Sequence, residues 1–140
     1  MDSQQAPSDA PGDGLAGRRV LVVEDSPVVA EACGDMLRDL GCVVVGPAGN
    51  MAAALQMASD EDLDGAIVDI NIRGGKAFPV LKILAGRGVP FLLTSGYADW
   101  SMPEEWQGRP RLAKPYTPAG LRAGLEELLG SAPDSWSATI

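Results

Sequence analysis

Short apolar runs along the chain predict most of the strands of a sheet. The first, RRVLVVE at residues 18–24, holds four apolar residues in succession. Uninterrupted apolar runs of this length are typical of strands covered on both faces, as in a parallel sheet. The expected strands span residues 18–24, 42–46, 65–69, 89–94 and 111–113.

Helical patterns fill the intervals between these runs. Ser26 and Pro27 have the residue types of a helix N-cap and first helical position. Behind them, apolar side chains recur at the spacing of one helix face, and Gly41 follows as a stop signal. Helices are expected from Pro27 to about Leu40, from Met51 to about Ala58, from Ala77 to about Ala85 and from Pro118 to about Leu129, with at most a short one at residues 103–107.

The alternation of strand and helix predicts an α/β fold, a doubly wound five-stranded parallel sheet with helices on both faces. The expected domain spans residues 18–130, between an N-terminal tail at residues 1–17 and a C-terminal tail at residues 131–140. In such folds the working crevice lies outside the carboxyl ends of the strands. The side chains at those ends are therefore the candidates for function.

Charge and composition exclude several classes of function. A net charge of −8 disfavours direct binding of nucleic acid, because phosphate backbones reward basic surfaces. No apolar run approaches the roughly 20 residues that cross a membrane, and residues 1–17 lack the pattern of a signal peptide. We therefore expect no membrane insertion and a cytoplasmic location.

The scarcity of cysteine and the absence of histidine narrow the chemistry further. A chain without histidine has no Ser-His or Cys-His nucleophile pair and no histidine general base. Cys33 and Cys42 are too few for a tetrahedral zinc site and read as buried thiols. Any chemistry must rest on carboxylates, hydroxyls and lysine.

Residues of these types occupy four of the predicted strand ends. Glu24 and Asp25 follow the first strand, and Asp69 ends the third. The fourth strand ends in Thr94 and Ser95, and Lys114 follows the fifth. Each alone reads as an ordinary turn or surface residue, but together they predict one crevice that holds three acids, a hydroxyl and a lysine.

Such a cluster suits phosphoryl transfer assisted by a divalent cation. Three adjacent carboxylates repel one another, and Mg²⁺ relieves the repulsion while keeping sites for water and phosphate oxygens. The backbone carbonyl of Asn71 offers a further oxygen ligand. Asp69 is the candidate nucleophile, with Lys114 as a point charge and Thr94 as a hydroxyl donor to a phosphate oxygen.

The stretches VLVVEDSP (20–27), AIVDINI (66–72), FLLTSGY (91–97) and LAKPY (112–116) resemble the receiver domains of bacterial two-component response regulators. This resemblance implies a flavodoxin-like three-layer sandwich with strand order 2-1-3-4-5. It makes Asp69 the phosphoacceptor and Glu24 and Asp25 the acidic metal pair. It likewise implies Asn71 as a carbonyl ligand, Thr94 as the switch hydroxyl, Lys114 as the phosphate-binding lysine and a cis bond before Pro115.

Departures from that family pattern lie around the expected output region. Arg111 stands where the family has its switch aromatic, and Tyr97 offers an aromatic after Thr94 instead. Residues 96–110 lack a long apolar helical face, so the fourth helix is expected to be short or absent. The chain resembles the atypical FATGUY response regulators in these respects, although Ser95 interrupts the motif. Switching is expected to involve Thr94, Ser95, Tyr97 and Arg111.

The expected function is that of a stand-alone switch and not of an enzyme. A histidine kinase or histidine phosphotransfer protein would phosphorylate Asp69 with Mg²⁺ bound. Output would pass to another protein on the 4-5 face, which is the surface beside the fourth and fifth strands and the segment between them, or onward by phosphorelay. Tyr97, Trp100 and Trp106 are candidate anchors on that face, although the tryptophans fit packing over a shortened helix equally well.

Two alternative functions remain open at this stage. One is an interaction module on a receiver scaffold that works without phosphorylation. The other is a small Mg²⁺-dependent phosphatase with an aspartate nucleophile, of the haloacid dehalogenase type. Those phosphatases typically carry a second aspartate two residues after the nucleophile, and this chain has Asn71 there.

Overall fold

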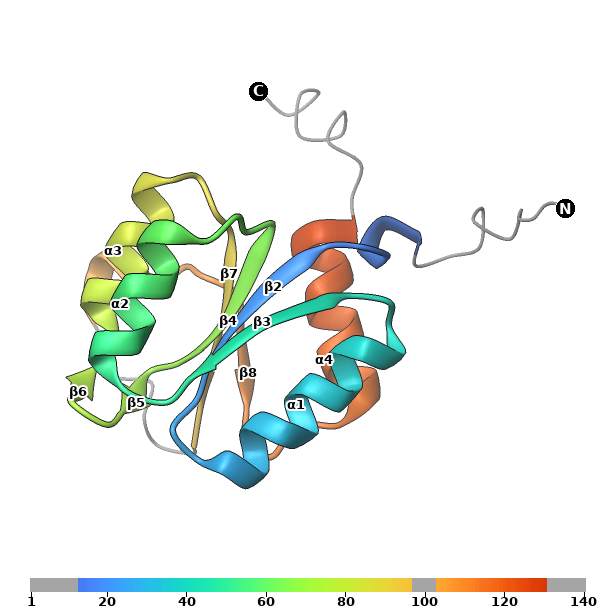
Figure 1. The fold of residues 1–140 in the computed structure, drawn as a ribbon, viewed down its shortest axis with the longest axis horizontal. Helices are drawn as coiled ribbons and strands as arrows, with labels where there is room; N and C mark the ends of the chain where they lie inside the picture. Colours follow the sequence, from blue (N-terminus) through green and yellow to red (C-terminus); the bar gives the residue numbers. More distant parts are fainter. Residues whose placement is uncertain (1–12, 97–102, 131–140) are drawn as a thin grey trace, which may run out of the picture.

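The computed structural model describes residues 13–96 and 103–130 of the chain. A parallel five-stranded sheet forms the middle layer, with α2 and α3 on one face and α1 and α4 on the other (Figure 1). Its strand order is β3-β2-β4-β7-β8, which confirms the expected order 2-1-3-4-5. The strands are β2 (Arg19–Val23), β3 (Val43–Ala48), β4 (Gly65–Asp69), β7 (Phe91–Ser95) and β8 (Arg111–Ala113).

The helices begin where the capping residues predict. Side-chain oxygens of Ser26, Asn50 and Thr117 each accept a backbone N–H from the first turn of the following helix, at 3.4, 2.9 and 3.0 Å. These bonds satisfy N–H groups that have no partner inside a helix. The helices are α1 (Pro27–Asp39), α2 (Met51–Asp60), α3 (Phe78–Gly86) and α4 (Pro118–Leu125), and α4 continues into a π-helical turn, η4 (Glu126–Gly130).

The central strands are buried on both faces, as their apolar runs predict. All five residues of β4 and all five of β7 are buried. One apolar cluster fills the space under α2 and α3, and a second fills the space under α1 and α4. The sheet therefore forms a rigid support, and its carboxyl edge holds the candidate residues.

The folded part of the chain starts earlier than the pattern of residues suggests. A 3₁₀ turn, η2 (Asp13–Leu15), packs against the end of η4, and its Leu15 is only 1% exposed. The N–H of Gly17 donates to the carbonyl of Gly41 at 2.8 Å. Residues 13–17 thus belong to the domain and not to a tail. The sequence did not predict this, because one apolar side chain in a polar stretch is too weak a pattern to predict burial.

A small hairpin directly follows β4. It pairs β5 (Asn71–Ile72) with β6 (Gly75–Lys76), and Ile72 is buried. The carbonyl of Arg73, at its tip, accepts the N–H of Met51 at 2.9 Å. The hairpin is therefore held against the start of α2 and gives Asn71 a defined position.

The connection from β7 to β8 agrees with the expected short or absent fourth helix. Its described residues, 103–110, contain one 3₁₀ turn, η3 (Glu104–Trp106). Trp106 is 4% exposed and belongs to the core under α3, so its role as an exposed anchor is wrong and the packing alternative holds. Within the described part of the chain, no helix has the length and apolar character needed to cross a membrane.

Candidate functional site

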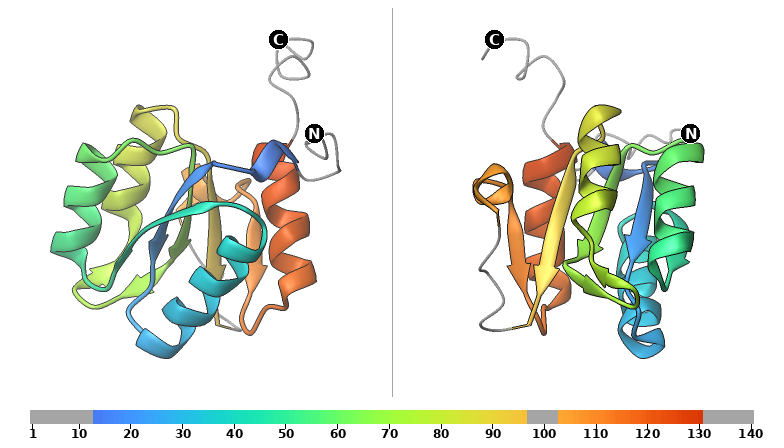
Figure 2. Two further views of the ribbon diagram at one scale, coloured as in Figure 1. Left: turned by 45° about the vertical axis from the view of Figure 1, so that its right-hand side comes forward. Right: turned by 90° about the vertical axis from the view of Figure 1, so that its left-hand side faces the viewer.

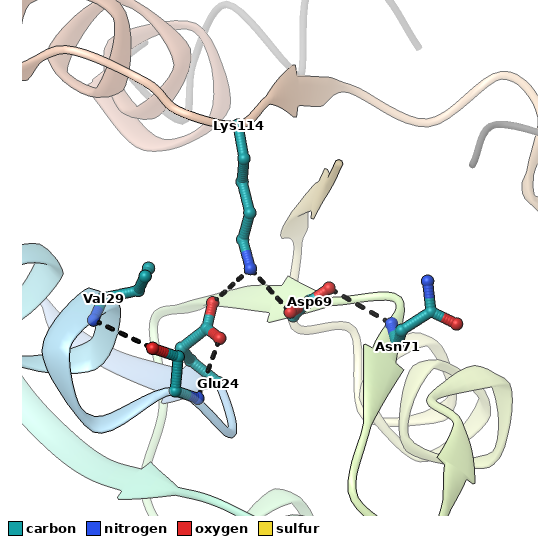
Figure 3. Close-up of polar contacts among 6 residues, drawn as sticks. Glu24, Val29, Asp69, Asn71 and Lys114 are labelled. Atoms are coloured by element: carbon teal, nitrogen blue, oxygen red, sulfur yellow. Dashed lines mark hydrogen bonds and ion pairs between the residues drawn. The ribbon is translucent and has the colours of Figure 1, made fainter. Parts of the chain in front are cut away.

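Candidate residues that follow β2, end β4 and follow β8 meet at the carboxyl edge of the sheet (Figure 3). The pairing register explains why: Val23 of β2 lies beside Val68 of β4, and Asp69 lies beside Thr94 of β7. Ser95 in turn pairs with Ala113 of β8, directly before Lys114. Parallel strands in this register end at one level, so residues more than 40 positions apart in sequence share one site.

Three carboxylates form the floor of this site. Glu24, Asp25 and Asp69 each offer a ligand oxygen, and these oxygens lie within 4.8 Å of one another. Glu24 and Asp69 are each 5% exposed, while Asp25 is half-buried. Three anionic groups at this separation need a compensating cation.

Lys114 supplies one positive charge by bridging two of the acids. Its Nζ lies 2.7 Å from Oε1 of Glu24 and 2.7 Å from Oδ2 of Asp69. Figure 3 shows the side chain descending from the end of β8 between them. The backbone N–H of Lys114 donates to the carbonyl of Ser95 at 2.8 Å, and the Lys114–Pro115 bond is cis, as the resemblance implies.

Backbone N–H groups orient the same two carboxylates. The N–H of Ser26 donates to Oε2 of Glu24 at 3.1 Å, and the N–H of Asn71 donates to Oδ1 of Asp69 at 3.1 Å. Each acid therefore has one oxygen on Lys114 and the other on a backbone donor. Carboxylates held on both oxygens are fixed in direction, which is a form of preorganisation.

Burial and pairing act on the pKa values of Glu24 and Lys114, and both values are raised. Burial raises the pKa of Glu24, and hydrogen bonds from Lys114 and Ser26 offset only part of this effect. Burial acts to lower the pKa of Lys114, but its hydrogen bonds to Asp69 and Glu24 prevail and the pKa is raised. Lys114 is therefore a cation at neutral pH, in direct contact with both carboxyl groups.

The expected switch residues lie in different settings. Thr94 and Ser95 are buried at the end of β7, and the carbonyl of Thr94 accepts the N–H of Ile70 at 3.0 Å. Arg111 is exposed at the start of β8, where its guanidinium donates to the carbonyl of Gln107 at 2.7 Å. Tyr97 and Trp100 lie outside the described residues.

The donor set of the site fits Mg²⁺. Mg²⁺ prefers a few carboxylate oxygens, keeps several waters and accepts phosphate oxygens. Two buried acids and one half-buried acid at the mouth of the crevice offer that combination. Soft ligands are absent from the three residues, which argues against zinc or copper at this position.

Beside the site lies an apolar groove that the sequence patterns do not reveal. It measures about 410 Å³ and runs between α1 and the segment after β8, lined by Val28, Val29, Ala32, Met36, Lys114, Pro115 and Tyr116. Burial, followed by a hydrogen bond with Cys33, raises the pKa of Tyr116. The one signal of this contact in the sequence is the aromatic Tyr116 directly after Lys114 and Pro115.

Comparison with known proteins places this geometry in a described family. The family model "Response regulator receiver domain" matches residues 20–125. Among curated proteins, the nitrate/nitrite response regulator protein NarP of Escherichia coli K12 is 32% identical over 72 residues, which is 51% of this chain and 34% of NarP. The chain thus aligns with about a third of that relative.

Solved structures resemble the fold over most of the chain. SdrG of Sphingomonas melonis Fr1 is 38% identical with a TM-score of 0.72, covering 82% of this chain and 98% of SdrG. The receiver domain of sensor histidine kinase PA1611 of Pseudomonas aeruginosa PAO1 is 28% identical with a TM-score of 0.72, covering 83% of this chain and 100% of that one. The latter structure has a magnesium ion coordinated in its active-site cleft.

Proposed function

The chain belongs to the response regulator receiver family, and we propose that it is a phosphorylation switch whose phosphoacceptor is Asp69. The observation that carries this proposal is the position of Asp69, whose carboxylate is shared between the acid cluster and Lys114. The candidate nucleophile, the Lys114 ammonium and the other acids of the cluster therefore meet at the carboxylate of Asp69. The resemblance to the FATGUY subgroup stays a prediction.

In the proposed reaction, an oxygen of Asp69 attacks the phosphorus of a phosphohistidine on a histidine kinase or histidine phosphotransfer protein. The P–N bond breaks, its electron pair leaves with the imidazole, and an aspartyl phosphate remains. Mg²⁺, held by Glu24, Asp25, Asp69 and the carbonyl of Asn71, would neutralise charge on the transferring phosphoryl oxygens. The buried carboxylate and its fixed neighbours position the nucleophile before the donor arrives.

Lys114 and Thr94 are proposed to act on the phosphoryl group after transfer. The new group adds about −1.5 to −2 charge units and three acceptor oxygens. The Lys114 ammonium, already 2.7 Å from Asp69, would pair with one of these oxygens. Thr94 pairs with Asp69 across neighbouring strands, which supports a hydrogen bond from its hydroxyl to a second phosphoryl oxygen.

Output is proposed to be contact with another protein on the 4-5 face, or phosphorelay, in the cytoplasm. Ser95, Tyr97 and Arg111 are the proposed read-out residues near Thr94. Arg111 is exposed at the place of the usual family aromatic, which supports a role for Tyr97 in its stead. If phosphorylation changes partner binding of Tyr97→Ala and wild type equally, Tyr97 has no part in switching.

Phosphotransfer profiling tests the proposal. Candidate histidine kinases are first autophosphorylated and then mixed with wild type, with Asp69→Ala, and with Asp60→Ala as a control acid at the end of α2. We expect at least one kinase to label wild type and Asp60→Ala, with no label on Asp69→Ala. Repeated turnover of a small phosphomonoester would instead favour a phosphatase, and no response to Mg²⁺ with phosphodonor or beryllofluoride would favour an interaction module.

A further inference from the structure

The residues of β8, the last strand of the sheet, determine its register against β7 only weakly. It has three residues, it lies at the edge of the sheet, and only its middle residue, Leu112, is half-buried. The register of a strand is fixed mainly by a buried face, and a slip of one residue turns every side chain to the other face. Lys114 directly follows β8, so such a slip would remove its ammonium from between Glu24 and Asp69.

Three side chains stack at the amino end of this strand. The rings of Phe91, the first residue of β7, and Trp106 meet edge to face, with centroids 5.9 Å apart. The guanidinium carbon of Arg109 lies 4.8 Å from the Phe91 centroid and 5.5 Å from the Trp106 centroid. Because Phe91 and Trp106 are 1% and 4% exposed, the cation–π contacts tie Arg109 to the core.

Backbone hydrogen bonds connect the fixed position of Arg109 to the start of β8. The N–H of Arg109 donates to the carbonyl of Trp106 at 3.2 Å, and the N–H of Leu93 donates to the carbonyl of Pro110 at 3.0 Å. Figure 2 (right) shows η3 beside the amino end of β8, at the end of the strand opposite the site. The stack therefore sits where it can set the start of β8, and Arg109 lies five residues before Lys114.

We propose that Arg109 and Trp106 are positioning residues for Lys114. Their stack on Phe91 holds β8 in register with β7, and that register places the ammonium of Lys114 between Glu24 and Asp69. Three side chains thereby supply the anchorage that a longer packed helix before β8 would otherwise give. This inference rests on the proposed function only in so far as Lys114 assists phosphoryl transfer.

Arg109→Gln removes the cation and keeps a polar side chain, so it tests the inference with little risk to folding. We expect labelling by acetyl phosphate with Mg²⁺ to slow by about threefold to tenfold. Mg²⁺ affinity without phosphodonor should not fall, because the carboxylates directly follow β2 or end β4 and do not belong to β8. Arg109→Lys should recover part of the rate, and Arg122→Gln, which removes an exposed arginine on α4, should label like wild type.

A double substitution separates positioning from general destabilisation. If Arg109 acts through Lys114, Arg109→Gln should cause no further loss of labelling rate when Lys114 is already methionine. Equal fractional losses in both backgrounds would overturn the inference, because they would mean that Arg109 acts by another route.

Amide hydrogen exchange of the unphosphorylated protein supplies a readout that needs no phosphorylation. The amides of Leu93 and Lys114, which donate to Pro110 and Ser95, should exchange faster in Arg109→Gln than in wild type. If wild type accepts no phosphoryl group, the proposed function fails, and exchange still decides the inference. Unchanged protection of both amides together with an unchanged labelling rate would contradict the inference alone.

Discussion

Lys114 meets two opposing requirements of the site. Its Nζ neutralises Glu24 and Asp69, at 2.7 Å from each, and so stabilises the arrangement without a metal. The same positive charge repels a divalent cation placed among the three acids. Lys114 should therefore strengthen binding of the phosphoryl group and weaken binding of Mg²⁺ alone. The site should hold Mg²⁺ well only when a phosphoryl group is bound with it.

Lys114→Met keeps the length of the side chain and removes the charge. We expect Mg²⁺ to bind about tenfold more tightly, since a unit charge a few ångströms away contributes on the order of 1 kcal/mol or more at a partly screened site. Phosphorylation by acetyl phosphate should slow in the same variant. Titration of Mg²⁺ measures the first effect, with Lys82→Met on α3 as the control, and weaker Mg²⁺ binding would contradict the reasoning.

Glu24 gives a pH-dependent prediction. Burial raises its pKa in the folded protein, so the folded state binds this proton more tightly than the unfolded state. The ionised group therefore costs stability at pH 7, and the cost disappears as pH falls through the raised pKa toward its ordinary value. Without metal, Glu24→Gln should be more stable than wild type at pH 7, with a difference that shrinks on acidification.

Denaturant unfolding of Glu24→Gln and wild type at several pH values measures this difference. Mg²⁺ affinity should be lower in Glu24→Gln, because the variant loses a carboxylate ligand. A stability difference that grows as pH falls would show that the sign is wrong. Asp60→Asn, an exposed change at the end of α2, serves as the control.

At the scale of elements, the sequence patterns predicted regular strands and helix starts but not irregular segments. The central strands β2, β4 and β7 were predictable because their apolar runs reflect burial on both faces. The helix starts were predictable because Ser26, Asn50 and Thr117 cap them by side-chain bonds. The hairpin of β5 and β6 was not, because four residues interrupted by two glycines show no period. Its position comes from a tertiary bond between Arg73 and Met51.

Gly74 allows a test of that hairpin. Its φ is +108°, and a Cβ added there would lie 2.8 Å from the Cβ of Met51. Gly74→Ala should lower the free energy of unfolding by about 1–3 kcal/mol and weaken Mg²⁺ binding through displacement of Asn71. Gly108→Ala, which has open space around its added methyl group, is the matched control. Equal stability of the two variants would mean that the hairpin yields without cost.

At the scale of the whole molecule, two apolar clusters hold the sheet while its carboxyl edge stays polar. The sequence predicted that edge because a parallel sheet brings all strand ends to one side, whatever the details of packing. It could not place Trp106, since an aromatic in an irregular segment fits a core or a surface equally well. Nor did it include Leu15, which shares an apolar cluster with Leu128 and Leu129 from the other end of the described chain.

Leu15 is therefore part of the folded domain. Leu15→Ala should lower the free energy of unfolding by about 2–5 kcal/mol, the usual cost of such a cavity. Val28→Ala, at a side chain 77% exposed, should have little effect. Denaturant unfolding compares the two variants. An unchanged free energy of unfolding in Leu15→Ala would mean that residues 13–17 do not contribute to the folded domain.

The most direct measurement on the proposed switch is the intact mass of the protein after incubation with acetyl phosphate and Mg²⁺. Wild type should gain the mass of one phosphoryl group, and the gain should vanish in Asp69→Ala, on chelation of Mg²⁺ and after treatment with hydroxylamine, which cleaves acyl phosphates. Asp60→Ala should gain the group as wild type does. An equal gain in Asp69→Ala, or none in wild type with any phosphodonor, would contradict phosphorylation of Asp69.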